Sequence, residues 1–141
     1  MPKGGEDESD PTNCYAPYQV HMMTTAISPT TLRTWMDGAK RVCVVDVRDD
    51  DYNQGGHIRG AVNFPSANFT KSFEDLVETS ASAEAVVFHC QFSQVRGPQC
   101  ARYYESKIKA LDSFKGQEVC VLSGGFNSWY DEFACTKYIE R

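Results

Sequence analysis

Cys90 and Arg96 are the residues of this sequence whose types and spacing best suit a chemical reaction, because only five residues separate a thiol from a guanidinium. If the backbone between them curls, the peptide N–H groups of residues 91–96 form a nest that binds an anion above the sulfur. Arg96 closes this nest with a planar fork that matches two oxygens of a tetrahedral oxyanion. The same positive field favours the nucleophilic thiolate form of Cys90. We therefore expect Cys90 and Arg96 to be catalytic, and a substrate-binding loop made of Gln91, Phe92, Ser93, Gln94, Val95 and Arg96.

The segments on either side of this loop are a predicted strand and a predicted helix. Residues 85–88 form a short apolar run rich in Val and Phe, which is typical of a buried strand. Gly97 and Pro98 permit a sharp exit, and Pro98 suits the first turn of a helix that runs to Leu111. A cysteine alone is often a small buried hydrophobe, and an arginine is mostly a surface residue. The combination of strand, thiol, guanidinium and helix start favours a functional site instead.

The rest of the chain alternates short strands with helices. Strands are predicted at residues 24–27, 41–47, 58–64 and 118–122, and helices from Pro29 to a stop at Gly38, at 69–79 and at 126–133. This alternation favours an α/β fold with a central, mainly parallel sheet flanked by helices on both faces. Ligands of such sheets bind beyond the carboxyl ends of the strands. The Cys90 loop, Arg48 and the Gly124-Gly125 turn are all predicted at that edge.

Residues 89–98, His-Cys-Gln-Phe-Ser-Gln-Val-Arg-Gly-Pro, resemble the active-site loop of the mitotic-inducer cell-cycle dual-specificity phosphatases. They are also similar to the loop of small relatives of these enzymes, which include eukaryotic arsenate reductases of rhodanese fold. The likeness extends over residues 23–133 and includes the motifs at 44–48, 55–58 and 124–129. The resemblance implies a rhodanese-like fold and an enzyme that works through Cys90.

The leading hypothesis is a phosphotyrosine or dual-specificity phosphatase, with a phosphorylated protein or a small oxyanion as substrate. Cys90 attacks phosphorus to form a cysteinyl-phosphate, Arg96 and the loop amides stabilise the equatorial oxygens, and water releases phosphate. The first alternative is arsenate reduction in the same loop, with glutathione or glutaredoxin as reductant. The second is sulfur transfer through a Cys90 persulfide, which the resemblance disfavours because typical rhodanese sulfurtransferases have a loop one residue shorter. An intact Cys90 and Arg96 also disfavour a noncatalytic binding module.

Other polar residues near this edge are assigned supporting roles. Asp46 ends an apolar strand, so we expect a structural carboxylate that is hydrogen-bonded to loop amides or to an arginine. His89 precedes the nucleophile on a strand, so its side chain points to the opposite side and orders the loop. Residues 49–51 are three aspartates that indicate a solvated acidic run rather than a general acid. Gln91 and Val95 stand where related phosphatases often carry Glu, so the loop itself offers no proton donor.

Length, charge and composition set the remaining expectations. The chain has 141 residues, which favours one rhodanese-like catalytic domain at residues 23–141 behind a flexible tail at 1–22. A net charge of -5 argues against binding to nucleic acid or to an acidic membrane surface. No apolar run approaches the ~18 residues of a membrane span. No metal site is expected, because Cys and His show no zinc-finger spacing, and no cofactor is implied except the reductant of an arsenate reductase.

The six cysteines indicate free thiols rather than disulfides. The N-terminal residues lack the apolar core of a secretory signal, so we expect an intracellular, reducing location in the cytoplasm, the nucleus or both. The resemblance adds one point about oxidation, because many mitotic-inducer phosphatases carry a protective cysteine where this chain has Val47. Cys100, in the first turn of the helix after the loop, is then the plausible internal thiol to resolve an oxidised Cys90.

Overall fold

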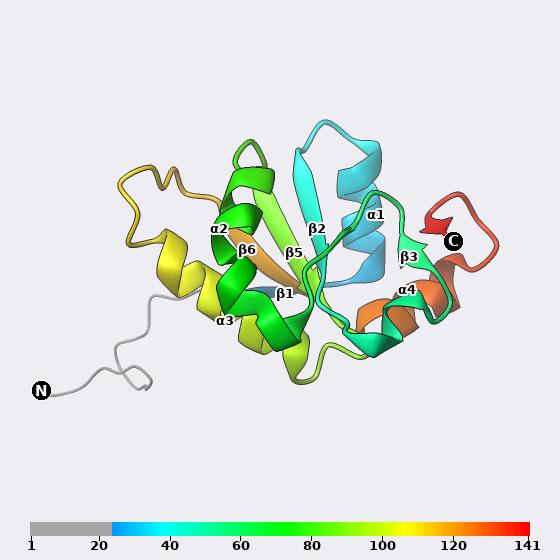
Figure 1. The fold of residues 1–141 in the computed structure, drawn as a ribbon. Helices are drawn as coiled ribbons and strands as arrows, with labels where there is room; N and C mark the ends of the chain where they lie inside the picture. The colour runs from blue at the N-terminus through cyan, green and yellow to red at the C-terminus, as the bar shows by residue number, and fades with distance from the viewer. Residues whose placement is uncertain (1–23) are drawn as a thin grey trace, which may run out of the picture.

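The computed structural model describes residues 24–141 and is built on a five-stranded sheet (Figure 1). The predicted tail at residues 1–22 lies outside the described residues. The sheet has the order β1-β6-β5-β2-β4, and its paired strands all run parallel. Its strands are β1 (Thr25–Ile27), β2 (Val42–Asp46), β4 (Val62–Asn63), β5 (Ala85–His89) and β6 (Glu118–Leu122). Their carboxyl ends therefore meet at one edge, as the sequence predicts.

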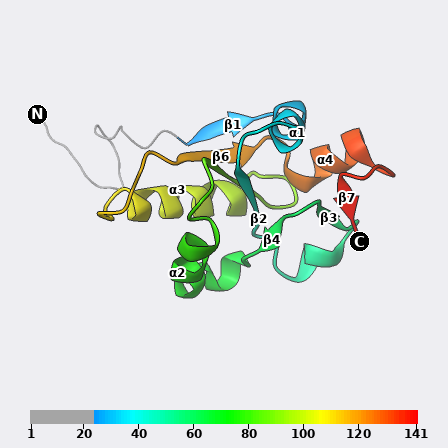
Figure 2. The same cartoon turned by 90° about the horizontal axis from the view of Figure 1, so that it is seen from above.

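Four helices cover the two faces of this sheet (Figure 2). They are α1 (Pro29–Asp37), α2 (Phe69–Thr79), α3 (Arg96–Ile108) and α4 (Gly125–Phe133). Side chains alternate along β5, so Val86 and Phe88 join one apolar cluster and Val87 joins the other. The first cluster includes Leu76 of α2 and Tyr104 of α3, and the second contains residues of α1 and α4. This arrangement confirms the predicted α/β fold with helices on both faces.

Local sequence signals explain where several helices begin and end. Ser28 caps α1, since its side chain accepts a hydrogen bond from the backbone N–H of Thr31 at 3.1 Å, and Pro29 occupies the first turn. Gly38 ends this helix, as predicted. The α2 helix has the predicted bounds, 69–79. Its apolar residues repeat at helical spacing, which made this helix predictable.

The prediction of a single strand at residues 58–64 is wrong. The structure has two strands there, because Gly60 adopts φ 78° and turns the chain between them. The first, β3 (His57–Ile58), pairs antiparallel with β7 (Ile139–Glu140) in a separate two-stranded sheet. The second, β4, pairs with β2. The sequence analysis did not predict β7, whose two residues carry no strand pattern of their own.

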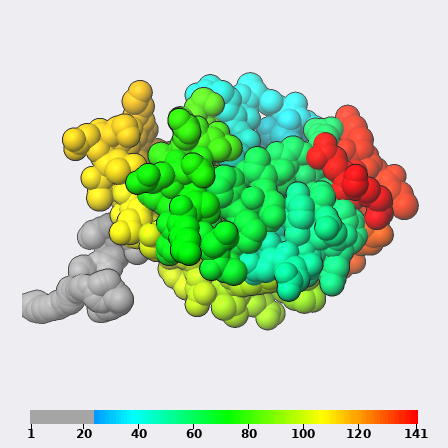
Figure 3. Space-filling view, viewed as in Figure 1, coloured from blue at the N-terminus to red at the C-terminus, as the bar shows by residue number. Residues whose placement is uncertain are grey.

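The surface view places the loop after β5 beside the segment that follows β2. Figure 3 shows the yellow-green loop at the lower edge of the molecule, in contact with the blue-green residues after β2. Two short 3-10 helices, η1 (Asp50–Asn53) and η2 (Ser66–Asn68), shape the connections at this edge. Within residues 24–141, no helix combines the length and the hydropathy that a membrane crossing requires.

Candidate active site

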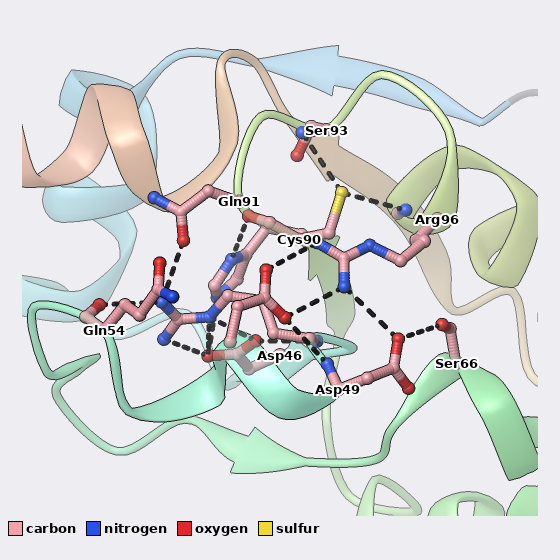
Figure 4. A network of polar contacts seen from close by, with 12 residues as sticks. Asp46, Asp49, Gln54, Ser66, Cys90, Gln91, Ser93 and Arg96 are labelled. Carbon is pink, nitrogen blue, oxygen red and sulfur yellow. Dashed lines mark hydrogen bonds and ion pairs between the residues drawn. The ribbon is translucent and has the colours of Figure 1, made fainter.

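The Cys90 loop leaves the carboxyl end of β5 and enters α3 at Arg96. Two further segments meet it at this edge, namely the residues after β2 and the first turn of α4 (Figure 4). Cys90 is 3% exposed, so the loop surrounds it almost completely. The site therefore combines three segments that are far apart in the sequence.

Two backbone N–H groups of the loop point at the sulfur of Cys90. The N–H of Ser93 donates to this Sγ at 3.2 Å, and the N–H of Gly97 donates to it at 3.3 Å. Ser93 reaches this position with φ 56°, and its buried Oγ has no hydrogen-bond partner among the described residues. The predicted nest ended at Arg96, so the sequence analysis missed Gly97. The glycine at this position was no clear signal, because a Cβ there would lie in ordinary van der Waals contact, 3.4 Å from the backbone N of Cys90.

Arg96 contacts two aspartates that follow β2. Its Nη1 donates to Asp51 Oδ1 at 3.0 Å and to Asp49 Oδ2 at 3.2 Å, and its Nη2 donates to Asp51 Oδ2 at 2.7 Å. The hydrogen bond from Arg96 is the main reason that the pKa of Asp51 falls to about 2. The prediction of a solvated acidic run at residues 49–51 is therefore wrong for Asp49 and Asp51, because both carboxylates point at Arg96, Asp51 from the 3-10 turn η1 and Asp49 from the residue before it. Asp50 alone is exposed.

The N-terminus of α4 holds the first two residues of the loop. The N–H of Phe126 donates to the carbonyl oxygen of Cys90 at 2.9 Å, and the N–H of Asn127 donates to that of Gln91 at 2.8 Å. Gly125 makes this close approach possible, because it has φ 61° and a Cβ there would lie 2.6 Å from the Cys90 oxygen. The Gly124-Gly125 turn that was predicted at this edge therefore supports the loop directly.

His89 is fully buried behind the loop. Its Nδ1 lies 3.1 Å from the carbonyl oxygen of Cys90, which only accepts, so Nδ1 carries the hydrogen. Burial lowers the pKa of His89, although the charge of Asp46 opposes this shift. The Nε2 atom lies 3.8 Å from Asp46 Oδ2 and has no hydrogen-bond partner in the described part of the chain. A neutral imidazole in this position orients the Cys90 peptide.

Asp46 and Arg48 form a fully buried ion pair beneath the site. The carboxylate of Asp46 accepts from Nε and Nη2 of Arg48 at 2.8 to 3.1 Å. Arg48 also donates to the carbonyl oxygens of Gln54 and Gly56 and to the side-chain oxygen of Gln91. The structure thus places Asp46 in a structural pair with an arginine, and the Gln91 side chain points toward Arg48. The sequence analysis placed Arg48 at this edge but not at the centre of this network.

The remaining loop residues line the entrance to the site. Phe92 is 53% exposed and Val95 is 59% exposed, so the loop presents two apolar side chains to solvent. A hollow of about 610 Å³ lies beside Phe92 and is also lined by Ser93, Gln94, Pro98 and Arg102 of the loop and of α3.

The geometry favours nucleophilic attack by a thiolate on an anionic centre. The sulfur lies among backbone donors and beside a guanidinium, which together stabilise negative charge. The pKa values of Asp49 and Asp51 are both lowered, so these carboxylates are ionised near neutral pH. Within residues 24–141, no three His, Cys, Asp or Glu side chains form a group that could hold a metal ion.

Residues 28–132 match the family model of the rhodanese-like domain. The chain is 36% identical over 89 residues to the dual specificity phosphatase Cdc25 of Arabidopsis thaliana. The aligned stretch covers 62% of this chain and 61% of that protein. It is 36% identical over 90 residues to arsenate reductase 2.1 of Oryza sativa, covering 63% of this chain and 56% of that protein. It therefore spans less than two thirds of these two relatives. The dual specificity phosphatase ibp1 of Schizosaccharomyces pombe is 35% identical over 119 residues, covering 73% of this chain and 86% of its own length.

Two solved structures are similar in fold and in sequence. Ygr203w, a yeast protein tyrosine phosphatase of the rhodanese family, superposes with a TM-score of 0.65 at 28% identity, covering 83% of this chain and 92% of its own. The As-Sb reductase from Leishmania major superposes with a TM-score of 0.66 at 29% identity, covering 82% of both chains. The relatives thus include phosphatases and reductases of oxyanions.

Proposed function

Because the chain belongs to the family of rhodanese-like domains, we propose that it is a cysteine-dependent protein phosphatase of phosphotyrosine or dual specificity. One observation carries this proposal. The Cys90 sulfur accepts two backbone N–H groups of its own loop, and Arg96 lies beside it at the carboxyl edge of the sheet. This environment places hydrogen-bond donors and a positive charge at the sulfur, and it suits the transferring phosphoryl group. Residues 23–141 would form the catalytic domain.

The proposed reaction proceeds through a cysteinyl-phosphate. The thiolate of Cys90 attacks phosphorus in line, so that a sulfur–phosphorus bond forms while the phosphorus–oxygen bond of the ester breaks. Arg96 and the loop amides hold the equatorial oxygens as charge develops on them. Water then attacks the phosphorus of the intermediate, which releases inorganic phosphate and restores the thiolate. This route requires no metal.

The rim of the site supports a phosphorylated protein as the substrate. Phe92 and Val95 belong to the same loop as the thiol and are exposed, so the ring of a phosphotyrosine could pack against them. A phenolate also leaves more readily than an alkoxide. This difference matters here because Asp49 and Asp51 have lowered pKa values and are poor proton donors at neutral pH. Aryl phosphates should therefore react faster than alkyl phosphates.

Arsenate reduction is the second candidate. The similarity to a rice arsenate reductase is as strong as that to a plant phosphatase, at 36% identity for both. In this reaction the thiolate of Cys90 displaces hydroxide from arsenate to form a thiol–arsenate adduct. A glutathione thiolate then attacks the Cys90 sulfur, so that the sulfur–arsenic bond breaks, arsenite leaves and a mixed disulfide of Cys90 and glutathione forms. A second thiol, from glutathione or glutaredoxin, reduces this disulfide and restores Cys90. An intracellular, reducing location would suit both candidates, and the five cysteines in the described residues are free thiols.

Three parallel assays test the proposal, with p-nitrophenyl phosphate, with arsenate plus glutathione and glutaredoxin, and with thiosulfate plus cyanide. We expect turnover of the aryl phosphate that Cys90→Ser abolishes, by at least on the order of 10⁴-fold, as loss of a nucleophile does. Cys135→Ser is the matched control, because Cys135 is an exposed thiol. Efficient sulfur transfer without turnover of phosphate or arsenate would refute both candidates.

A further inference from the structure

The guanidinium of Arg96 uses only some of its N–H donors on the two aspartates. Nη1 carries two hydrogens, and both have acceptors, one in Asp51 and one in Asp49. Nη2 gives one of its two hydrogens to Asp51. Three of the five donors are therefore engaged. Among residues 24–141, the Nε–H and the second N–H of Nη2 have no hydrogen-bond acceptor.

The two unused donors lie on one edge of the guanidinium plane. The Nε–H and the adjacent N–H of Nη2 are parallel, so they form a fork that fits two oxygens of a tetrahedral anion. Figure 4 shows the guanidinium of Arg96 between the sulfur of Cys90 and the carboxylate of Asp49. The edge that faces the sulfur is thus a different edge from the one that meets the carboxylates. An oxyanion above Cys90 would bind the fork without displacing either aspartate.

The two aspartates differ in how firmly other groups hold them. Asp49 accepts from the Ser66 hydroxyl at 2.6 Å and from the backbone N–H of Ala67 at 2.9 Å, so it is anchored independently of Arg96. Asp51 accepts from Arg96 through both of its oxygens, and it also accepts from the backbone N–H of Asp49. The two-point contact with Asp51 fixes both the position and the plane of the guanidinium. Asp51 is therefore the residue that orients Arg96.

We propose that Asp51 is a positioning residue, whose carboxylate holds Arg96 with its Nε and Nη2 edge turned toward an oxyanion above Cys90. This inference rests on the proposed function for its role in turnover, but the orientation of Arg96 can be tested separately. The position of a charged group near a reacting centre matters greatly, since a displacement of about 1 Å can reduce a rate by roughly 100-fold. Asp51 acts through Arg96 and does not itself touch the substrate.

The test compares Asp51→Asn with Asp50→Asn. Both changes remove one negative charge from the same 3-10 turn, but Asp50 is exposed and makes no contact with Arg96. With p-nitrophenyl phosphate, Asp51→Asn should lower kcat by about 10- to 100-fold with a smaller change in KM. Asp50→Asn should leave both constants near those of the unchanged protein. Asp51→Glu, which keeps the carboxylate, should recover part of the lost kcat.

A second measurement does not depend on activity. NMR relaxation of the Arg96 Nε–H group should report an ordered side chain in the unchanged protein and in Asp50→Asn, and a mobile one in Asp51→Asn. An ordered Arg96 and an unaltered kcat in Asp51→Asn would overturn the inference. So would a higher kcat or tighter binding of inorganic phosphate, because Asp51 would then compete with the substrate. If the unchanged protein turns over none of the three test substrates, the proposed function fails, while the mobility of Arg96 still decides the role of Asp51.

Discussion

A Cβ atom on Gly125 would lie 2.6 Å from the carbonyl oxygen of Cys90, which is closer than any side chain can approach. The two residues are in contact because the first turn of α4 donates its N–H groups to the loop. The position also has φ 61°, a conformation that L-residues rarely adopt. The shape of the Cys90 loop therefore depends on a glycine that is 35 positions away in the sequence.

Gly125→Ala should displace the loop and reduce both stability and activity. Gly116→Ala is the matched control, since Gly116 has φ 83° but a Cβ there meets no atom within 4 Å. The backbone conformation alone should lower the free energy of unfolding by about 1–2 kcal/mol in either variant. The clash should cost Gly125→Ala roughly a further 1–3 kcal/mol. Urea unfolding and aryl phosphatase assays measure the difference, and equal effects in the two variants would show that the loop does not rest on this contact.

Arg96→Lys should reduce kcat by about 100-fold, which is the loss expected when a preorganised donor to the transition state is removed. Lysine keeps the charge but cannot reproduce the planar fork. Steady-state kinetics with p-nitrophenyl phosphate test this expectation. Arg33→Lys on the exposed surface of α1 should have no effect. Near-normal turnover by Arg96→Lys would show that the planar guanidinium is not needed to stabilise the transition state.

His89 should make the stability of the protein depend on pH. Burial lowers the pKa of His89 from 6.5 in the folded state, so below about pH 6.5 the unfolded chain binds a proton that the folded chain does not. The free energy of unfolding should then fall as the pH drops through this range, by at most about 1.4 kcal/mol per pH unit for one proton. The pKa of Asp51, at about 2, lies far below this window.

His89→Asn should remove this dependence while keeping an amide that can donate to the Cys90 carbonyl. Urea unfolding at about pH 7.5 and about pH 5.5 compares the two proteins. His57→Gln is the control, because His57 lies at the surface beside Asn53. If the free energy of unfolding falls as much between these two pH values in His89→Asn as in the unchanged protein, then groups other than His89 cause the pH dependence.

Oxidation of Cys90 should proceed past the sulfenic acid. Burial raises the pKa of Cys100 to about 12 and that of Cys43 to about 11, so both thiols are protonated at neutral pH and attack slowly. Excess peroxide should therefore inactivate the enzyme irreversibly through the sulfinic acid, at the same rate in Cys100→Ser. Mass spectrometry identifies the products. A Cys90–Cys100 disulfide as the main product would show that the helix protects the loop despite the high pKa.

The elements that surround the loop could be predicted because their signals are local. The Val-rich run of β5, the helical spacing of Phe69 and Leu76 in α2, and the Ser28 cap of α1 each lie within one segment. Cys90 and Arg96 could be singled out because both lie on one short loop. Parallel strands then place this loop, Arg48 and Gly125 at the same edge without any knowledge of side-chain contacts.

The features that sequence reasoning missed depend on contacts between distant segments. The pairing of β3 with β7 joins two-residue strands that are 80 residues apart, too short to carry a pattern. The contact of Asp51 with Arg96 depends on how η1 turns after β2, and an acidic run looks the same in sequence whether it is solvated or paired. The donation from Gly97 to the sulfur requires α3 to begin at Arg96, before the Pro98 that the sequence analysis placed in its first turn.

The anchoring of the Cys90 loop by Phe126 and Asn127 also determines when this site can exist during synthesis. Strand β5 and the thiol leave the ribosome well before α4 does, so a nascent chain that ends ahead of Phe126 carries Cys90 and Arg96 without the two amides that hold the loop. Pairing of β5 with β6 likewise awaits residues 118–122. The thiol would thus acquire its enclosed setting only after residues 126 and 127 have left the ribosome.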